Sequence, residues 1–343
     1  MEEAIIIEKS VIIVAVFAIT MLFAMYCTLA ERKIAAWIQD RRGPNRAGPG
    51  GILQPLADGL KLFAKEEFMP NTPNTFLFVF GPFISMTMAL MTSAVIPWGD
   101  TLEIGGRKVI LQAADINVAM LYVFAVLSVS VYGVMIGGWA SNNKYSLISA
   151  MRVASQMISY EIAMGLSIVA ILMMHSSMSL RDIAAGQHEM HWNIFYQPLG
   201  FFIFLICSFA ETNRTPFDLA ECEQELIGGY HTEYSSMRMG FFLFAEYAAM
   251  FISSTLLAVL YLGAYNYPGM TWAAENWGEN IANILGIAVL FGKICFFIFL
   301  YMWVRWTIPR FRYDQLMNLG WKTLIPLAIL NIVVTAVVLL LNR

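Results

Sequence analysis

Eight apolar segments, separated by polar or turn-forming stretches, constrain the fold of this chain more than any other feature. A helix needs about 20 apolar residues to cross roughly 30 Å of hydrocarbon. All the segments but the short fifth one approach that length. A soluble domain is excluded because 59% of the 343 residues are hydrophobic and only 13% are charged. The segments lie near residues 10–30, 75–97, 117–139, 150–174, 195–210, 239–262, 282–304 and 323–341.

The sequence therefore predicts an all-α polytopic membrane protein with about eight transmembrane helices, forming a single integral membrane domain over residues 1–343. All nine tryptophans fall at or just beyond the ends of the segments, as in the aromatic belts of membrane proteins. Of the 21 Lys and Arg residues, 15 fall in or at the edges of four connections, which the positive-inside rule places in the cytoplasm. Both termini are then expected on the outer side. The four connections are 31–74, 140–150, 211–238 and 305–322.

The first of these connections contains a predicted helix that is too short and too charged to span a membrane. Residues 41–51 are rich in Gly and Pro and cannot be helical. Residues 52–66 then recover a helical period, with Leu53, Leu56, Leu60 and Phe63 on an apolar stripe and Gln54, Asp58, Lys61 and Lys65 on a polar one. We expect an amphipathic interfacial helix on the cytoplasmic side, whose polar face is either solvated or turned toward a ligand or partner.

The third cytoplasmic connection holds a quarter of all the carboxylates. A capping box at Thr215-Pro216-Phe217-Asp218 predicts the start of a helix, and Gly228-Gly229 predicts its end. This helix would carry Asp218, Glu221 and Glu225 on one face. Like charges so close together affect one another's protonation. Ionisable groups beside a bilayer are costly, so this density indicates a site for protons or cations. The six acids between residues 210 and 233 are Glu211, Asp218, Glu221, Glu223, Glu225 and Glu233.

Charges also lie inside the predicted spans. Glu161 is midway through the fourth span and Lys293 midway through the seventh, while Glu246 is in the sixth. A charge at the bilayer centre costs about 2.5–3.5 kcal/mol on insertion scales, so each should face the bundle interior or water. Two interpretations stay open for Glu161 and Lys293: a structural ion pair, or part of a proton path.

The sequence offers no complete set of ligands for a metal ion or an iron–sulfur cluster. Cys27, Cys207, Cys222 and Cys295 are far apart and form no CxxC motif, which argues against an iron–sulfur cluster or a zinc site. His188 and His191 make no complete site on their own. No Gly-rich nucleotide loop is present. We expect no metal and no cofactor bound by this chain alone.

Several motifs resemble one family. They are Glu-Arg-Lys at 31–33, Arg-Arg-Gly-Pro-Asn at 41–45, Gln-Pro-Leu-Ala-Asp at 54–58, Lys-Leu-Phe-Ala-Lys-Glu at 61–66, Gly-Trp-Ala-Ser-Asn at 138–142, Ser-Tyr-Glu at 159–161, Ala-Glu-Thr-Asn-Arg-Thr-Pro-Phe-Asp-Leu-Ala-Glu at 210–221 and Pro-Arg-Phe-Arg-Tyr-Asp-Gln-Leu at 309–316. Together they resemble the quinone-site membrane subunit of respiratory complex I, which is the H subunit of bacterial NADH:quinone oxidoreductase and subunit 1 of the mitochondrial enzyme. The resemblance runs from the first span to the last. Cys222 departs from it mildly, because a small residue such as glycine is expected there.

This resemblance implies a role in a proton-pumping NADH:quinone oxidoreductase of the bacterial inner membrane. The substrate would be a quinone, ubiquinone or menaquinone, with FMN and iron–sulfur clusters held by partner subunits. The partners would be the peripheral-arm subunits, including the one with the terminal cluster, and the small and antiporter-like membrane subunits. No nucleic acid is involved. The resemblance implies quinone-binding roles for Arg32, Arg41, Asp58, Lys61, Lys65 and Phe244, and proton-coupling roles for Glu31, Glu161, Glu211, Asp218, Glu221, Glu223, Glu225 and Glu246.

Other classes of protein predict other features. A secondary ion transporter would show related halves and paired broken helices, and neither is visible. A homologous membrane subunit of a membrane-bound hydrogenase or related dehydrogenase would share the fold, so partner subunits would distinguish it. The bases of the last connection, Arg305, Arg310, Arg312 and Lys322, either set topology or dock the peripheral arm.

Overall fold

The computed structural model describes residues 2–70, 74–104, 106–219 and 227–341. Its elements in chain order are α1 (Glu2–Ile38), η1 (Pro49–Gly51), α2 (Gln54–Ala64), α3 (Thr75–Thr92), η2 (Ser93–Val95), β1 (Thr101–Ile104), β2 (Arg107–Ile110), α4 (Ala119–Ala140), α5 (Lys144–His175), α6 (Leu180–Ala185), α7 (Asn193–Tyr196), α8 (Pro198–Glu211), η3 (Gly229–His231), α10 (Ser236–Tyr261), α11 (Met270–Trp277), α12 (Glu279–Thr307), α13 (Tyr313–Asn318), η4 (Leu319–Leu324) and α14 (Ile325–Leu341).

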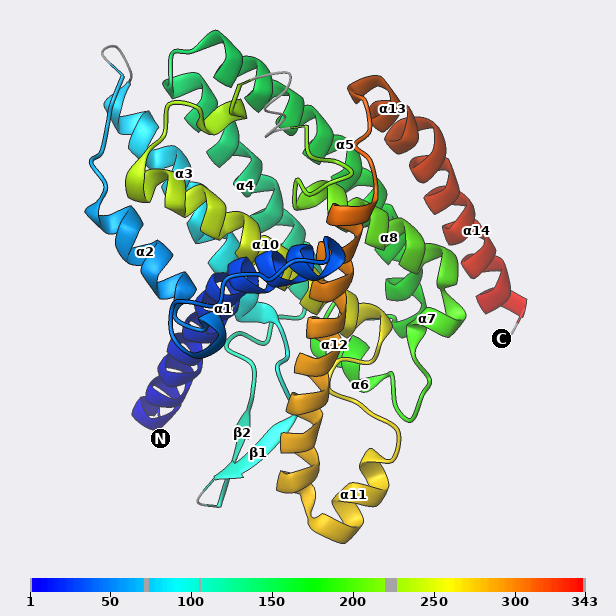
Figure 1. Ribbon diagram of the computed structural model, residues 1–343. Coiled ribbons are helices and arrows are strands. Elements are labelled where there is room, and N and C mark those ends of the chain that lie inside the picture. The colour runs from blue at the N-terminus through cyan, green and yellow to red at the C-terminus, as the bar shows by residue number, and fades with distance from the viewer. Residues whose placement is uncertain (1, 71–73, 105, 220–226, 342–343) are drawn as a thin grey trace.

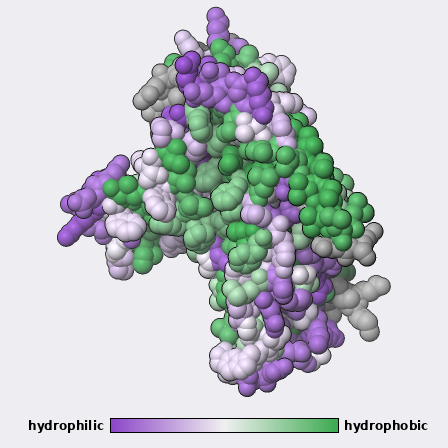
Figure 2. All heavy atoms as spheres, turned by 90° about the vertical axis from the view of Figure 1, so that its right-hand side faces the viewer, coloured by the Kyte–Doolittle hydropathy of each residue, from purple (hydrophilic) through white to green (hydrophobic). Residues whose placement is uncertain are grey.

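The predicted all-α polytopic architecture is confirmed. Seven helical stretches in the described residues are long and apolar enough to cross a membrane, and the shorter helix α8 corresponds to the short fifth segment. The one sheet in the described part of the chain is the antiparallel hairpin β1–β2. On the face seen in Figure 2, hydrophobic side chains gather across the middle, and hydrophilic ones lie above, below and on a projecting arm.

Helix α10 forms the centre of the bundle. It packs against α1, α3 and α12, and every residue from Met250 to Tyr261 is buried (Figure 1). Beside it, α3 and α4 approach closely because glycines face each other. A Cβ on Gly81 would lie 2.9 Å from the carbonyl oxygen of Gly133. The central position of α10 matters because this helix carries Phe244, Glu246 and Tyr247.

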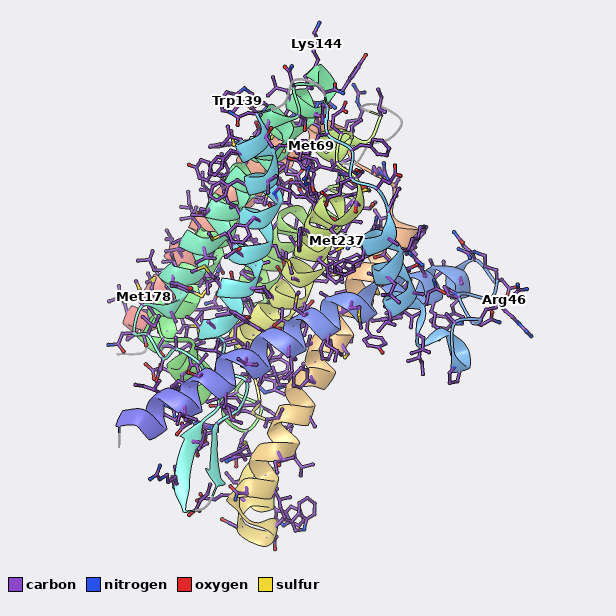
Figure 3. The ribbon with its side chains drawn as sticks, turned by 90° about the vertical axis from the view of Figure 1, so that its left-hand side faces the viewer. Arg46, Met69, Trp139, Lys144, Met178 and Met237 are labelled. Carbon is purple, nitrogen blue, oxygen red and sulfur yellow. The ribbon has the colours of Figure 1, made fainter. Side chains whose placement is uncertain are left out.

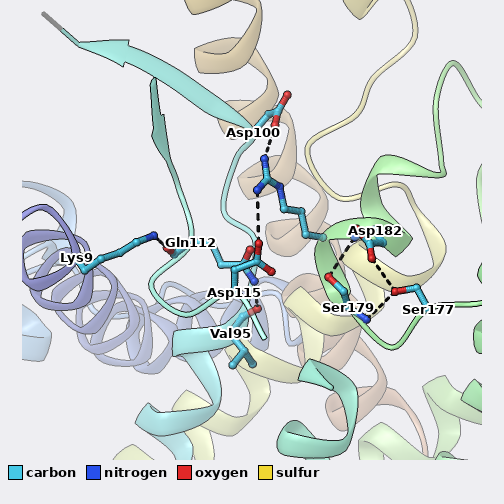
Figure 4. A network of polar contacts seen from close by, with 9 residues as sticks. Lys9, Val95, Asp100, Gln112, Asp115, Ser177, Ser179 and Asp182 are labelled. Atoms are coloured by element: carbon cyan, nitrogen blue, oxygen red, sulfur yellow. Dashed lines mark hydrogen bonds and ion pairs between the residues drawn. The ribbon is translucent and has the colours of Figure 1, made fainter. Parts of the chain in front are cut away.

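Lys9 and Arg181, which lie outside the four cytoplasmic connections, are found at one end of the molecule. Arg181 lies 3.7 Å from Asp100 and 3.5 Å from Asp115, and Lys9 Nζ donates to the carbonyl of Gln112 at 2.8 Å (Figure 4). The hairpin and α11 extend from this end, whereas α2 and α13 lie toward the other. The connections with α2 and α13, which the positive-inside rule places in the cytoplasm, therefore lie opposite the hairpin and α11.

The predicted helix start at Thr215 is wrong. Residues 212–219 form turns and irregular chain, because tertiary contacts take the carbonyl groups that a first helical turn would use. The carbonyl of Phe217 accepts from Gln156 Nε2 at 2.9 Å, and the carbonyl of Pro216 accepts from the backbone of Phe311 at 3.1 Å. Glu221, Glu223 and Glu225, together with Cys222, lie outside the described residues, so their predicted arrangement has no structural counterpart here.

Candidate functional site: an entrance cavity and buried carboxylates

Helices α1, α2 and α10 pack against one another (Figures 1 and 3). A cavity of about 240 Å³ lies between them. We call it the entrance cavity. Four of the six predicted quinone-binding residues line it, namely Arg32, Asp58, Lys61 and Phe244. The remaining walls are mostly apolar or small: Met25, Thr28, Pro55, Gly59, Leu62, Gly240, Leu243 and Tyr247. Arg41 and Lys65 do not line the cavity, and both are exposed.

Helix α2 is positioned by its two ends. Arg32 of α1 lies 2.8 Å from the Asp58 carboxylate, which itself accepts a hydrogen bond from Gln54 at 3.1 Å. At the other end, Ser236 Oγ lies 2.8 and 2.9 Å from the carbonyls of Leu62 and Lys65, so that its one hydroxyl hydrogen caps the C-terminal end of the helix. The apolar stripe of Leu53, Leu56, Leu60 and Phe63 is 52–71% exposed. An interfacial helix buries such a stripe in lipid.

Glu31 lies one residue before Arg32 but faces the protein interior, where it is fully compensated. Its Oε2 accepts from Arg214 at 2.6 Å and from the Tyr247 hydroxyl at 2.9 Å, and its Oε1 lies 2.7 Å from Arg305. The guanidinium of Arg214 also stacks 4.3 Å from the centre of the Tyr247 ring. We call these four residues, Glu31, Arg214, Tyr247 and Arg305, the Glu31 cluster.

Arg214 is only 3% exposed. Burial, the largest single influence, lowers the pKa of its guanidinium, but Glu31, Tyr247 and Glu246 together raise the pKa above its already high ordinary value. Arg214 therefore stays a cation at any pH at which the protein folds. The neighbouring Asp218 is 1% exposed and lies 3.1 Å from Arg310. Two arginines of the last connection thus bind acids of this same chain, a role that neither of our two interpretations of that connection included.

A second, smaller cavity of about 50 Å³ joins two more predicted carboxylates. Glu211, at the end of α8, and Glu246, on α10, both line it, together with hydroxyl and amide groups such as Ser85, Ser130 and Asn213. The Tyr230 hydroxyl donates to Glu246 at 3.1 Å. A volume of this size and polarity has room for at least one water molecule. We call it the carboxylate cavity.

Glu161 and Lys293 do not pair. The Glu161 carboxylate accepts a hydrogen bond from Ser128 of α4. Lys293 instead donates to the carbonyls of Leu262, Ala264 and Asn266 at 2.6, 2.8 and 2.7 Å. Those bonds use all three ammonium hydrogens. The interpretation as a structural ion pair is therefore wrong: Lys293 satisfies the carbonyls of the chain that follows α10.

Sequence reasoning missed four residues of the site. Arg214 pairs with Glu31. Tyr247 lines the entrance cavity and bonds Glu31, Arg305 completes the Glu31 cluster, and Tyr230 bonds Glu246. The only signal for Tyr247 was a hydroxyl directly after Glu246 in an apolar span. Arg305 was noted only as a base of the last connection, and Tyr230 gave no signal, because the partners of both lie on other elements.

The comparisons with known proteins cover nearly the whole chain. Residues 11–336 match the family model described as NADH dehydrogenase. The chain belongs to that family. Proteins named as the H subunit of NADH-quinone oxidoreductase resemble it along their full length. The one from Flavobacterium johnsoniae is 73% identical over 99% of this chain and 97% of its own length. The one from Flavobacterium psychrophilum is 73% identical over the whole of both chains. The one from Leptospira biflexa is 49% identical over 95% of this chain and 93% of its own.

Proposed function

We propose that this member of the NADH dehydrogenase family is the membrane subunit of a proton-pumping NADH:quinone oxidoreductase in a bacterial inner membrane. The termini would face the periplasm, as the distribution of bases predicts. Redox centres would come from peripheral subunits that carry FMN and iron–sulfur clusters, and the membrane neighbours would be small and antiporter-like subunits. The family match and the names of the relatives support this assignment.

The entrance cavity would admit the quinone, either ubiquinone or menaquinone. A quinone has two carbonyl oxygens on a flat ring and a long apolar tail. The cavity offers cationic donors in Arg32 and Lys61, an aromatic ring in Phe244 and apolar walls. Its volume of about 240 Å³ is below the roughly 300–1,000 Å³ of complete small-molecule sites. Partner subunits would therefore complete the site, with Arg41 and Lys65 near its exposed rim.

One observation carries the coupling part of the proposal: consecutive residues of α10 reach both cavities. Tyr247 lines the entrance cavity and donates to Glu31, while Glu246 lines the carboxylate cavity with Glu211. Reduction of a quinone to a quinol takes up two protons. A change of charge in the entrance cavity would act on Glu31 through Tyr247 and on Glu246 through the same helix, and interacting carboxylates titrate together. Glu161 and Asp218 would extend this chain, as would Glu221, Glu223 and Glu225.

The test uses the assembled complex with Arg32→Ala or Asp58→Asn. We expect quinone reduction to fall roughly tenfold, the loss of about 1.4 kcal/mol of binding, because a charged hydrogen bond contributes about 1.5–3 kcal/mol. NADH oxidation by an artificial acceptor should stay intact, since electrons enter elsewhere. Arg107→Ala, an exposed arginine on the hairpin at the opposite end of the molecule, is the matched control. If both activities fall together while assembly is normal, the cavity is not the quinone site.

A further inference from the structure

One buried amide lies between two of the carboxylates to which the proposed function gives a role in proton coupling. Gln156 of α5 is 1% exposed. Its Nε2 donates to the carbonyl of Ala210 at 2.9 Å and to the carbonyl of Phe217 at 2.9 Å. These two residues come directly before Glu211 and Asp218 in the chain. The two hydrogens of a single amide group therefore join the peptide groups from which both carboxylate residues start.

These bonds are not needed to satisfy the two carbonyl groups. The carbonyl of Ala210 also accepts from the backbone N–H of Asn213 at 3.3 Å, and that of Phe217 accepts from the backbone N–H of Leu219 at 3.0 Å. A carbonyl oxygen has two lone pairs, so each holds both donors and would stay paired without Gln156. What the amide adds is a fixed distance between the end of α8 and the irregular chain that follows it.

Gln156 destabilises the fold in a way that an apolar side chain would not. Among the described residues, no group donates a hydrogen bond to its buried Oε1. An unsatisfied buried acceptor lowers the free energy of unfolding. The contacts of Nε2 with carbonyl oxygens exclude the flipped amide, which would turn Oε1 toward them. A methionine of similar length would leave no oxygen unpaired, so the contribution of this glutamine lies in its donors.

The same stripe of α5 holds this segment at a second point. Helix α5 packs along α8 (Figure 1). Tyr160, one turn after Gln156, meets the ring of Phe217 edge-on, with the ring centres 5.3 Å apart. Glu161 is the next residue of α5. The chain before Asp218 is thus positioned from the helix that carries another of the predicted proton-coupling carboxylates.

We propose that Gln156 is a positioning residue for proton coupling. It holds Glu211 and Asp218 at the separation and orientation in which the protonation of one affects the other, and it exchanges no proton itself. This role follows because carboxylates titrate together only while they interact, and their interaction weakens with distance. The inference rests on the proposed function and adds to it an uncharged residue that lines neither cavity.

The test compares Gln156→Met with Gln187→Met in the assembled complex. Gln187 is another buried glutamine, between α6 and α7, but its Oε1 accepts from the backbone N–H groups of Asn193 and Gly263 at 3.1 and 3.0 Å. We expect Gln187→Met to lower the yield of complex sharply, because two buried donors lose their acceptor. Turnover per assembled complex should stay normal in that control.

Gln156→Met should show the reverse pattern, with a yield close to that of the wild type. Quinone reduction and proton pumping should fall together by roughly tenfold to a hundredfold, because a displacement of about 1 Å can cost about a hundredfold in rate. The loss should appear in kcat and not in the KM for quinone, since Gln156 does not line the entrance cavity.

A double variant separates positioning from a general weakening of the fold. Because Gln156 acts through Glu211, adding Gln156→Met to Glu211→Gln should lower turnover no further, whereas independent effects multiply. Gln156→Asn keeps the amide on a side chain that is one methylene shorter, so it should also lose turnover, and it decides the matter if Gln156→Met fails to assemble.

Two results would overturn the proposal. One is normal turnover per assembled complex in both variants of Gln156. The other is a fully multiplied loss in the double variant. Full turnover and pumping in Glu211→Gln alone is a different outcome, because it would overturn the proposed proton coupling on which the positioning role depends.

Discussion

Two buried carboxylates of this chain have opposite surroundings. Glu31 is 6% exposed and Glu211 is 5% exposed. Glu31 touches two arginines and a tyrosine hydroxyl at 2.6–2.9 Å. Among the described residues, no base lies within ion-pair distance of Glu211, which instead lines the carboxylate cavity. The first carboxylate is therefore held as an anion by fixed positive charge, whereas the second has only space for water beside it.

This contrast gives different roles to two members of the predicted proton-coupling set. A carboxylate between two guanidinium groups is stabilised in its charged form and anchors the elements that carry its partners. Glu31 in this way ties α1 to α10, to α12 and to the connection after α8. A carboxylate that lacks a base can gain or lose a proton at little cost to the fold. We therefore expect Glu31 to contribute chiefly to structure and Glu211 chiefly to proton coupling, and the following changes test that division in order of decreasing effect on stability.

Arg214→Ala should have the largest effect. Breaking a buried ion pair by removing one partner costs about 3–5 kcal/mol, because the remaining charge loses its compensation. We expect a sharp fall in the yield and thermal midpoint of the assembled complex. Lys108→Ala is the matched control, since Lys108 meets Glu279 at 3.8 Å on the surface and such pairs contribute about 0–1 kcal/mol. Adding Glu31→Gln to Arg214→Ala should recover part of the loss. No recovery would mean that Arg214 acts through some other contact.

Lys293→Met should have an intermediate effect. It leaves the carbonyls of Leu262, Ala264 and Asn266 without their donor, and an unsatisfied buried group costs about 1–3 kcal/mol. Because Lys293 does not touch Glu161, the effects of Lys293→Met and Glu161→Gln on unfolding should add to within about 0.5 kcal/mol. Thermal unfolding of both single variants and the double variant measures this. Rescue of either variant by the other would restore the ion-pair interpretation.

The structure shows which features of this chain could be predicted from local sequence patterns. The spans and the α2 stripe were predictable, because hydrophobic length and helical period are local properties. The polar face with Asp58 and Lys61 was predictable for the same reason, whereas the role of Arg32 came from the resemblance to the family. The partner of Lys293 was not predictable, since a sequence gives approximate depth in a span but not which neighbouring chain a side chain reaches.

The Glu31 cluster was not predicted, and the helix start at Thr215 was predicted wrongly, for a related reason. Glu31 and Arg214 are 183 positions apart in the chain, so nothing in the local pattern joins them. The signals at Thr215 and Pro216 were those of a helix start, but carbonyl contacts with Gln156 and Phe311 hold this stretch in an irregular form. Tertiary contacts override local propensity most strongly where a polar segment is buried, and Arg214, Thr215 and Asp218 are all buried.

Glu211→Gln should have the smallest effect on stability and a large one on turnover. The amide is isosteric with the carboxyl, and no ion pair is lost, so the thermal midpoint of the complex should hardly move. Quinone reduction and proton pumping should fall together, roughly a hundredfold, which is the low end for removal of a proton-transferring group. Glu211→Asp should keep more activity than Glu211→Gln, because the charge is retained even though the reach is shorter.

Glu233→Gln is the control for the loss of a carboxylate as such, since Glu233 accepts from Asn143 at 2.7 Å outside the two cavities. It should change neither turnover nor pumping per assembled complex. The decisive comparison is between Glu211→Gln and Arg214→Ala, with activity normalised to assembled complex. If Glu211→Gln lowers yield as strongly as Arg214→Ala and the surviving complexes pump normally, Glu211 is an anchor like Glu31, and the division between the two carboxylates is wrong. A normal yield with lost pumping would support a proton step in the cavity between α8 and α10, which Glu211 and Glu246 both line.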